Sequence, residues 1–331
     1  MVDVTSSSNK TTQVEQQLCP KGYSPIPVAT LAPGTILPFA ISTVIGRSPM
    51  LYRDAGQTFD EVRRLELETR EIETLYIKES EQPLYHEYLQ SNILRLLDFG
   101  DSNRPEAVER FYRTSQMVTR HFLDNPSSPE SGEAAKQVVT TSVDQMERAN
   151  DVLGYIHRVM DESPDLYAHS LHVALYGLAL ARSAGVDDLE VLSDFGVGLL
   201  LHDVGKTQLV DPVYSSSEEL DNESWARMKE HPQLGVKLVA DNPLVGDVAR
   251  DVILNHHEKL DGTGYPGGKK ADDLSLFAQI AAVVNTFDRR TTETPYRRAA
   301  ASVEVLRGMI IDEKDQYNPK LLASFVRLMA G

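Results

Sequence analysis

The sequence that decides the fold is HHEKLDGTGYPGG, residues 256–268. Its two adjacent histidines, His256 and His257, end an apolar segment with helical spacing, and a loop rich in glycine follows them. Each imidazole has its own donor and acceptor, so a buried pair needs two separate sets of partners. An adjacent pair at the end of a helix therefore indicates a polar site built into the core.

Other histidines accompany this pair along the chain. Of nine histidines, six lie between His169 and His257. His202 and Asp203 end an apolar helical run, and a glycine and Lys206 follow within three residues. Neighbouring residues project about 100° apart on a helix, so one metal can take both side chains, or the carboxylate can bridge two metals. The cluster as a whole indicates a metal site.

Two further positions extend the cluster. A Ser-Pro pair at 163–164 is a helix-start signal, after which Asp165 and His169 lie four residues apart on one helix face. Asp165 can be a metal ligand, or it can complement the helix dipole, and the sequence leaves both alternatives open. His231 directly precedes a proline, at a helix break from which its imidazole can reach the site.

Composition limits the classes of function. A formal net charge of −16 argues against sequence-independent nucleic-acid binding, and a phosphodiester substrate would need local cations to overcome it. The one cysteine, Cys19, can form no internal disulfide, so any metal must use histidines and carboxylates. We expect a cytoplasmic protein, because no stretch approaches the ~20 apolar residues that span a bilayer and residues 1–12 lack a signal-peptide core.

The 331 residues suffice for two domains. We expect a flexible tail over 1–22, a small α+β regulatory domain with a helical extension over 23–125, and an all-α domain over 133–331. The boundary falls in the Pro- and Ser-rich segment Asp124–Gly132, which reads as a loop or linker. The N-terminal domain has one helix, Phe59–Arg70, and its β-like runs are Ile26–Leu31, Thr35–Ile45, Met50–Arg53 and Thr74–Lys78.

From about Glu81 onward apolar residues recur every three or four positions, which predicts helices and no further strand pattern. A first helix is expected shortly after Glu81. The helices predicted after it are Pro105–Leu123, Glu133–Met160, Pro164–Ser183, Asp188–Val204, Asn222–Lys229, Pro232–Ala240, Val245–Glu258, Leu276–Phe287 and Tyr296–Asp312.

The order of these motifs resembles the HD-GYP subgroup of the HD phosphohydrolase superfamily over about Asp151 to Ala330. The matching residues are His169, His202-Asp203-x-Gly205-Lys206, His231-Pro232, His256-His257-Glu258 and Asp261-Gly262-x-Gly264-Tyr265-Pro266. The resemblance implies an all-α HD-type phosphohydrolase domain that hydrolyses the bacterial second messenger cyclic di-GMP to pGpG or GMP.

The resemblance also implies roles for single residues. The metal ligands would be His169, His202, Asp203, His231, His256 and His257, with Asp203 bridging two metals and Asp165 available for a third. The cofactors would be two or three divalent ions, iron or alternatively manganese. Two such ions about 3.5–4 Å apart activate water and neutralise phosphoryl oxygens. Lys206 would assist proton transfer or touch the substrate phosphate, and Tyr265 and Arg297 would contact the substrate.

Three positions depart from the family pattern. Asn285 stands where the family has an aspartate ligand, and a neutral amide is a weaker donor for a divalent ion. Thr294 replaces the first cation of an Arg-Pro-Tyr-Lys motif, and a lysine expected within 213–217 is missing. Cations that could compensate are Arg289, Arg290 and Arg298, although each is equally consistent with a solvated helix surface.

These departures leave two classes of function open. The first is a cyclic di-GMP phosphodiesterase with reduced activity, and the Gly-Tyr-Pro loop disfavours an HD phosphohydrolase acting on another nucleotide. The second is an impaired module that binds cyclic di-GMP or docks a diguanylate cyclase through Gly264-Tyr265-Pro266. The predicted helix Glu133–Met160 could pair with its copy in a homodimer. His86 and His121 read as ordinary surface or core histidines, and the sequence names no ligand for the N-terminal domain.

Overall fold

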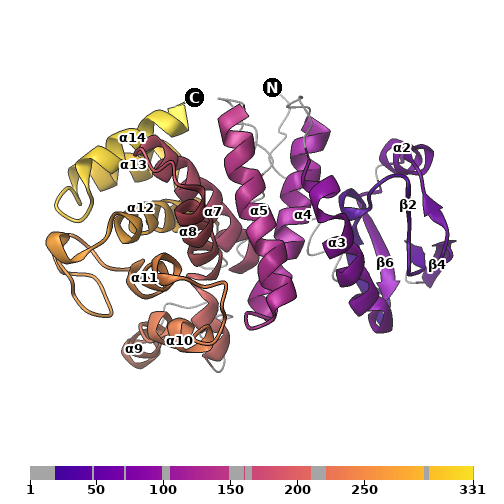
Figure 1. Cartoon of the computed structure of the whole chain (residues 1–331), viewed down its shortest axis with the longest axis horizontal. Helices are drawn as coiled ribbons and strands as arrows, with labels where there is room; N and C mark the ends of the chain where they lie inside the picture. The colour runs from indigo at the N-terminus through magenta and orange to yellow at the C-terminus, as the bar shows by residue number, and fades with distance from the viewer. Residues whose placement is uncertain are drawn as a thin grey trace. The chain divides into compact units, whose positions relative to one another are not determined.

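The computed structural model describes residues 19–46, 48–70, 72–98, 105–148, 160, 166–209, 221–293 and 298–330. The chain divides into two compact units, one up to Met117 and the other from Val118 (Figure 1). The division falls inside helix α4 (Pro105–Asp124), and α5 (Pro129–Arg148) follows after four residues. The expected linker is thus shorter than Asp124–Gly132, because Ser128 accepts a hydrogen bond from the amide of Ser131 and starts α5 early.

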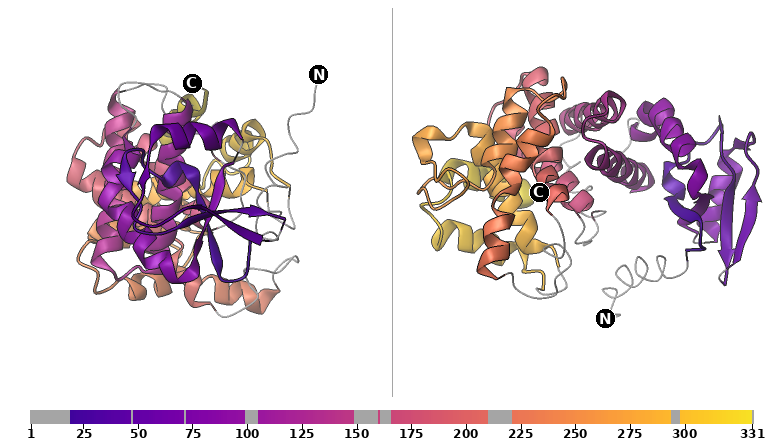
Figure 2. Two further views of the ribbon diagram at one scale, coloured as in Figure 1. Left: turned by 90° about the vertical axis from the view of Figure 1, so that its right-hand side faces the viewer. Right: turned by 90° about the horizontal axis from the view of Figure 1, so that it is seen from below.

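The N-terminal unit is a small α+β fold, as the sequence predicts. Its main sheet is antiparallel with strand order β1-β6-β3-β4, and a second sheet pairs β2 with β5 (Figure 2). The strands are β1 (Tyr23–Pro27), β2 (Thr35–Ile36), β3 (Ile41–Ile45), β4 (Ser48–Arg53), β5 (Thr58–Phe59) and β6 (Thr74–Lys78), and the helices are α2 (Glu61–Thr69) and α3 (Gln82–Leu97).

Two of the expected β-runs are corrected by the structure. The run Thr35–Ile45 forms two strands in different sheets. In the segment that connects the two strands, Leu37 and Phe39 are buried, and the amide of Leu37 donates to the carbonyl of Gln57. Pro38 lies within that segment and has no amide proton to donate to a ladder. The run Ile26–Leu31 ends as a strand at Pro27 and continues as a turn of 3-10 helix.

Helix α3 closes the core of this unit. Its tyrosines reach the strands and their connections: the hydroxyl of Tyr88 accepts from the amide of Ala32 at 2.8 Å, and Tyr85 bonds to Thr30. Both rings meet Phe39 edge to face at 5.5 Å. The apolar positions that the sequence predicts for this helix are therefore its buried face.

The C-terminal unit is helical in all its described parts, which confirms the predicted all-α domain. Among the described residues its β-structure is limited to one isolated bridge between Asp261 and Lys270. After α5 the helices are α7 (Leu166–Ser183), α8 (Leu189–Leu201), α9 (Asn222–Met228), α10 (His231–Leu238), α11 (Asp247–Asn255), α12 (Leu276–Thr291), α13 (Ser302–Ile311) and α14 (Pro319–Ala330). The predicted helix from Tyr296 begins at Ser302, and α14 was not expected.

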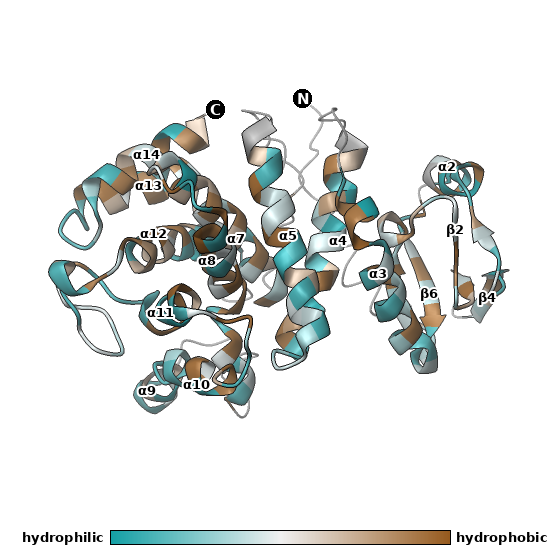
Figure 3. Cartoon of the chain, in the orientation of Figure 1, coloured by the Kyte–Doolittle hydropathy of each residue, from teal (hydrophilic) through white to brown (hydrophobic). Residues whose placement is uncertain are grey.

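Helices α7 and α8 form the centre of this unit. Both are buried on nearly all sides, and α8 packs on α5, α7 and α11. Figure 3 colours the hydrophobic residues of these helices brown. A helix that is apolar all round belongs in a core. Within the described residues, none of the helices combines the length and apolarity needed to cross a membrane.

The apolar side chains of helix α5 are buried in the core of the C-terminal unit. Val138, Val139 and Val143 are each at most 2% exposed, and Val139 packs against Gly196 of α8. These valines are therefore not available as a dimer seam. Residues 149–159 of the predicted helix Glu133–Met160 lie outside the described residues.

Candidate metal centre

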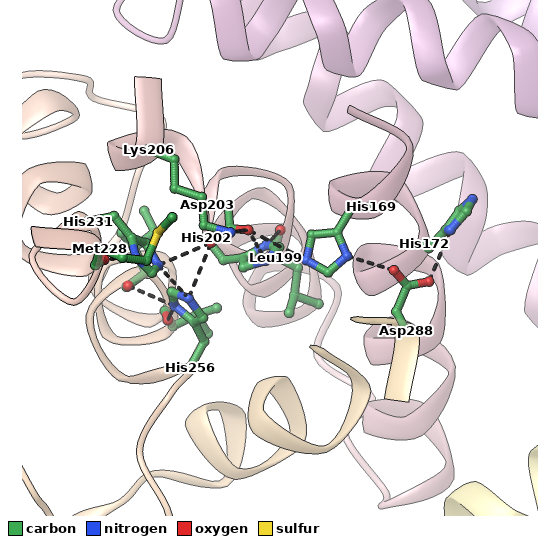
Figure 4. Close-up of polar contacts among 12 residues, drawn as sticks. His169, His172, Leu199, His202, Asp203, Lys206, Met228, His231, His256 and Asp288 are labelled. Atoms are coloured by element: carbon green, nitrogen blue, oxygen red, sulfur yellow. Dashed lines mark hydrogen bonds and ion pairs between the residues drawn. The ribbon is translucent and has the colours of Figure 1, made fainter. Parts of the chain in front are cut away.

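Four chain segments bring the six expected ligands together. Figure 4 shows all of them but His257. His169 comes from α7, and His202-Asp203 follows the last turn of α8. His231 is the first residue of α10, and His256-His257 follow α11. Their donor atoms form two groups that could each hold a metal ion, one of Asp203, His231, His256 and His257 and the other of His169, His202 and Asp203.

Asp203 is common to both groups and directs one oxygen toward each. Its Oδ1 atom lies 3.1 Å from Nε2 of His231 and 3.6 Å from Nε2 of His256. Its Oδ2 atom lies 3.5 Å from Nε2 of His202 and 3.6 Å from Nε2 of His169. The carboxylate is 1% exposed. This geometry suits a carboxylate that bridges two cations.

The hydrogen bonds of the histidines fix which nitrogen faces the centre. Nδ1 of His202 donates to the carbonyl of Leu199 at 2.7 Å, and Nδ1 of His231 donates to that of Met228 at 2.7 Å. Nδ1 of His256 donates to the carbonyl of Ile253 at 3.0 Å. A carbonyl can only accept, so in the neutral ring the proton is on Nδ1 and Nε2 carries a lone pair.

These lone pairs point at one another. Nε2 of His231 lies 3.1 Å from Nε2 of His256, and Nε2 of His202 lies 3.2 Å from Nε2 of His169. Burial lowers the pKa of His169 and His231, and lowers that of His256 to about 3, so these rings are neutral near pH 7. Neutral imidazoles whose lone pairs converge beside a carboxylate are the donor set that divalent transition metals prefer.

Asp288, on α12, orients His169 from behind. Its Oδ2 accepts from Nδ1 of His169 at 2.6 Å, and its Oδ1 accepts from Nδ1 of His172 at 3.0 Å. Burial alone would raise the pKa of Asp288, but the two imidazoles lower it well below its ordinary value. Asp288 and His172 were not assigned a role from the sequence. A signal was present, because Asp288 lies one helical turn after Asn285.

Lys206 lies directly against Asp203. Its ammonium group forms an ion pair with Oδ2 of Asp203. Burial raises the pKa of that carboxyl group, but Lys206 and His202 lower it well below its ordinary value. Burial lowers the pKa of Lys206 itself, against the effect of Asp203. The lysine therefore places an ammonium group beside the carboxylate that is common to both groups of ligands.

Two more polar atoms fit a metal. Oδ1 of Asn285, which is 2% exposed, and Nε2 of His257 are buried and have no hydrogen-bond partner among the described residues. Unpaired polar atoms are costly in a core, and both residues line the cavity at this centre. Asp165 and Arg297, also predicted to act here, lie outside the described residues.

Backbone packing explains why glycines stand within two of the motifs. A Cβ atom at Gly205 would overlap the carbonyl of His231 and the amide of Gly235, so the turn after Asp203 can pack on α10 only with glycine. A Cβ at Gly264 would overlap the backbone of His257 and Glu258. The buried carboxylate of Glu258 accepts from the amides of Gly267 at 2.6 Å and Lys269 at 3.0 Å and holds the glycine-rich loop.

A cavity of about 500 Å³ opens beside His257 and Asn285. Tyr265 forms part of its wall and stacks on His257, with ring centroids 4.4 Å apart and planes 20° from parallel. Its cationic lining residues are Lys229, Lys259, Arg289 and Arg290, whereas Arg298 is exposed and is not among them. Arg289 and Arg290 were predicted as compensating cations, while Lys229 and Lys259 were not considered from the sequence.

Comparisons with known proteins agree with this geometry. Residues 156–321, half of the chain, match the family model described as HD domain. The cyclic di-GMP phosphodiesterase PA4108 of Pseudomonas aeruginosa is 30% identical over 198 residues, which cover 60% of this chain and 47% of that protein. The 3'3'-cGAMP-specific phosphodiesterase 2 of Vibrio cholerae is 28% identical over 186 residues, covering 56% of this chain and 35% of that protein. The matched region spans less than half the length of either relative.

A solved structure shares the fold. Bd1817, a HDG"Y"P protein from Bdellovibrio bacteriovorus, has a TM-score of 0.71 and 22% sequence identity, and the match covers 93% of this chain and 100% of that one. With residues 156–321 matching its model, the chain belongs to the HD domain family, and its ordered histidines and Gly-Tyr-Pro loop follow the HD-GYP pattern.

Proposed function

We propose that this chain is a metal-dependent phosphodiesterase that hydrolyses cyclic di-GMP to pGpG or GMP. The observation that carries the proposal is the convergence of four Nε2 lone pairs on Asp203, because a cation between them is the natural way to satisfy them. The names of the relatives support cyclic di-GMP as the substrate.

The ligands in this proposal are His169, His202, Asp203, His231, His256 and His257, with Asn285 as a weaker donor. Two divalent ions, iron or alternatively manganese, would lower the pKa of a water nucleophile and neutralise phosphoryl oxygens when bound. Imidazole ligands add no negative charge, so the centre stays cationic in a chain of net charge −16. Asp165 is the proposed ligand for a third ion.

The chain's own side chains bind and orient the substrate. Lys206, half-buried against Asp203, holds a positive charge where the scissile phosphate would lie, and it can deliver a proton to the leaving oxygen. Arg289 and Lys259 line the adjacent cavity and counter the negative charge of a second phosphate. Tyr265 forms the wall between them and His257, and Arg297 is the proposed contact from the segment after α12.

The test uses the full chain prepared without oxygen and loaded with Fe(II) or Mn(II). We expect conversion of cyclic di-GMP to pGpG or GMP, followed by chromatography, and no conversion by Asp203→Asn, which keeps the shape of the bridging residue. Parallel assays use 3'3'-cGAMP, because relatives are named for it. If the chain with two bound metals hydrolysed neither compound, the proposed phosphodiesterase activity would be wrong.

The second candidate function is a binding module. Asn285 favours it, since a neutral amide at the ligand position weakens the centre. In that case cyclic di-GMP would bind without turnover, or the loop Gly264-Tyr265-Pro266 would dock a diguanylate cyclase domain. Calorimetry with cyclic di-GMP and the metal-loaded chain separates these outcomes. Homodimer formation remains a proposal, to be measured by sedimentation.

A further inference from the structure

We propose that Trp225 is a stacking platform for one nucleobase of the cyclic dinucleotide, on the side of the cavity away from the metal centre. This inference rests on the proposed function and assigns the recognition of the base to a residue outside the HD-GYP motifs. It makes the cavity a site for a base at one end and phosphates at the other.

Trp225 is the chain's only tryptophan and lies on α9, at the rim of the cavity. Its side chain is 38% exposed, which is unusual for a ring that could otherwise be buried. The indole meets Tyr265 edge to face, with centroids 6.1 Å apart and planes 78° from parallel. Because more than a third of Trp225 stays exposed beside this contact, part of the indole is accessible for stacking at the cavity.

Lys229 holds a positive charge next to both rings. Its ammonium nitrogen lies 5.5 Å from the centroid of Trp225 and 6.0 Å from that of Tyr265. The lysine follows Trp225 by one helical turn, so the two side chains share a face of the same segment. An aromatic face beside an ammonium group is a combination that binds a base and its phosphate together.

A row of rings connects this platform to the metal centre. Trp225 contacts Tyr265, and Tyr265 stacks on His257, whose Nε2 has no hydrogen-bond partner in the described part of the chain. A phosphate held at the centre would therefore have a sugar and base leading along Tyr265 toward Trp225. The other aromatic residue of the lining, Tyr317, is 2% exposed and bonds to Lys259 and Thr286, so its ring is already packed.

The volume and charge of the cavity fit a dinucleotide. About 500 Å³ lies within the range of about 300–1,000 Å³ found for small-molecule sites. Arg290 is paired with Glu313 at 2.8 Å, and the other basic residues of the lining are Lys229, Lys259 and Arg289. Stacking tolerates any base, so cyclic di-GMP and 3'3'-cGAMP would use Trp225 equally.

The experiment uses the single tryptophan as its own reporter. The metal-loaded full chain is titrated with a non-hydrolysable analogue of cyclic di-GMP, which prevents turnover, while the fluorescence of Trp225 is recorded. We expect a saturable change in emission. Calorimetry then compares variants: Trp225→Ala should bind about 5- to 150-fold more weakly, as expected for loss of one stacked base, and Trp225→Phe should stay close to wild type.

Hydrolysis gives an independent readout with the metal-loaded chain. Trp225→Ala should raise KM by a similar factor and leave kcat nearly unchanged, because the indole binds a base and does not touch the reacting atoms. The affinity for inorganic phosphate, which has no base, should be equal in the wild type and in Trp225→Ala.

The outcomes separate this inference from the proposed function. Normal hydrolysis by Trp225→Ala with unchanged KM and affinity would reject base stacking on Trp225 but would leave the proposed phosphodiesterase activity supported. Fluorescence change and weakened binding without any hydrolysis in the wild type would support the platform and reject the enzyme. No binding of either dinucleotide to the wild type would overturn both, and Trp225 would then be a surface residue only.

Discussion

His231 and His256 face each other through their Nε2 atoms at 3.1 Å, while the Nδ1 atom of each ring donates to a main-chain carbonyl. The carbonyls belong to the turn that precedes each histidine, so the local helical structure sets the tautomer before any metal binds. Without a cation the two lone pairs would repel. The arrangement explains why histidines at helix ends, and not in helix centres, form this site.

The first prediction is that the two groups of ligands lose metal separately. His256→Gln should remove the ion held with His231, and His202→Gln should remove the ion held with His169, so each variant keeps about one metal per chain if two are bound in the wild type. Asp203→Asn should lose both, because Asp203 belongs to both groups. Elemental analysis after anaerobic preparation measures this, with His86→Gln in the other unit as the control. Equal metal content in Asp203→Asn and wild type would contradict the shared ligand.

The second prediction concerns the partner of His169. Asp288→Asn keeps the size of the side chain but has one acceptor oxygen for two imidazole donors, His169 and His172. His169 would then lose its acceptor or move its proton to Nε2, where it blocks a metal. We expect metal affinity to fall by about 10- to 100-fold, the usual cost of losing a residue that orients a ligand.

The matched control is His172→Phe, which removes the other donor and leaves the pair of Asp288 and His169 intact. Its metal affinity should stay near that of the wild type, although its thermal stability should fall because a buried ring is replaced. Competition with a chromogenic chelator measures both variants. If His172→Phe lowered metal affinity as much as Asp288→Asn does, Asp288 would act on general packing and not on His169.

Several motif residues could be predicted from the sequence because each lies in a local signal: His231 precedes a proline, and His202 and His256 end apolar helical runs. Asp288 had only its place one helical turn after Asn285 as a signal, because its partner His169 is 119 positions away in the chain and the packing of α12 against α7 brings them together. Trp225 was missed for the same reason. Its partner Tyr265 is in a loop whose path depends on the buried carboxylate of Glu258.

The fold class followed from periodicity, whereas element ends did not. The run Thr35–Ile45 alternates like one strand, yet the burial of Leu37 and Phe39 divides it between two sheets. Helix α14 begins at Pro319, which is a good first residue for a helix, but the sequence analysis predicted no helix after Asp312. Such choices are decided by tertiary packing and not by local preference.

The third prediction tests the packing of the His-Asp turn. Gly205→Ala should lower the stability of the C-terminal unit by about 1–3 kcal/mol, because the new methyl group meets the backbone of His231 and Gly235, which cannot move aside without shifting α10. The expected loss in Tm is about 2–4 °C for each kcal/mol. Gly308→Ala is the control: its Cβ meets only Asp312 at 3.9 Å inside α13, so it should stabilise by about 0.5–1 kcal/mol. Calorimetric melting of both variants with the same metal content gives the comparison. An unchanged Tm in Gly205→Ala would contradict the prediction.

The fourth prediction is that Asn285→Asp gains both metal and activity. Oδ1 of Asn285 is buried without a hydrogen-bond partner among the described residues and lines the cavity with His257. A carboxylate in its place would attract a metal cation by about 4 kcal/mol for each unit of positive charge, at a distance of about 4 Å and an effective dielectric constant of about 20. The cost of desolvating the carboxylate offsets most of this attraction. We expect metal affinity to rise about tenfold and the rate of cyclic di-GMP hydrolysis to rise with metal occupancy.

Asn285→Ala supplies the opposite arm, because it removes the oxygen and should lower metal affinity below that of the wild type. Metal content, cyclic di-GMP affinity and rate are measured in all three proteins, so that metal binding and substrate binding are separated. If Asn285→Asp bound metal more tightly but gained no rate, and neither it nor the wild type bound the nucleotide, then the changes at Thr294 and in 213–217 would have removed substrate recognition as well. The centre would then serve an interaction module, since a completed ligand set would have no substrate to act on.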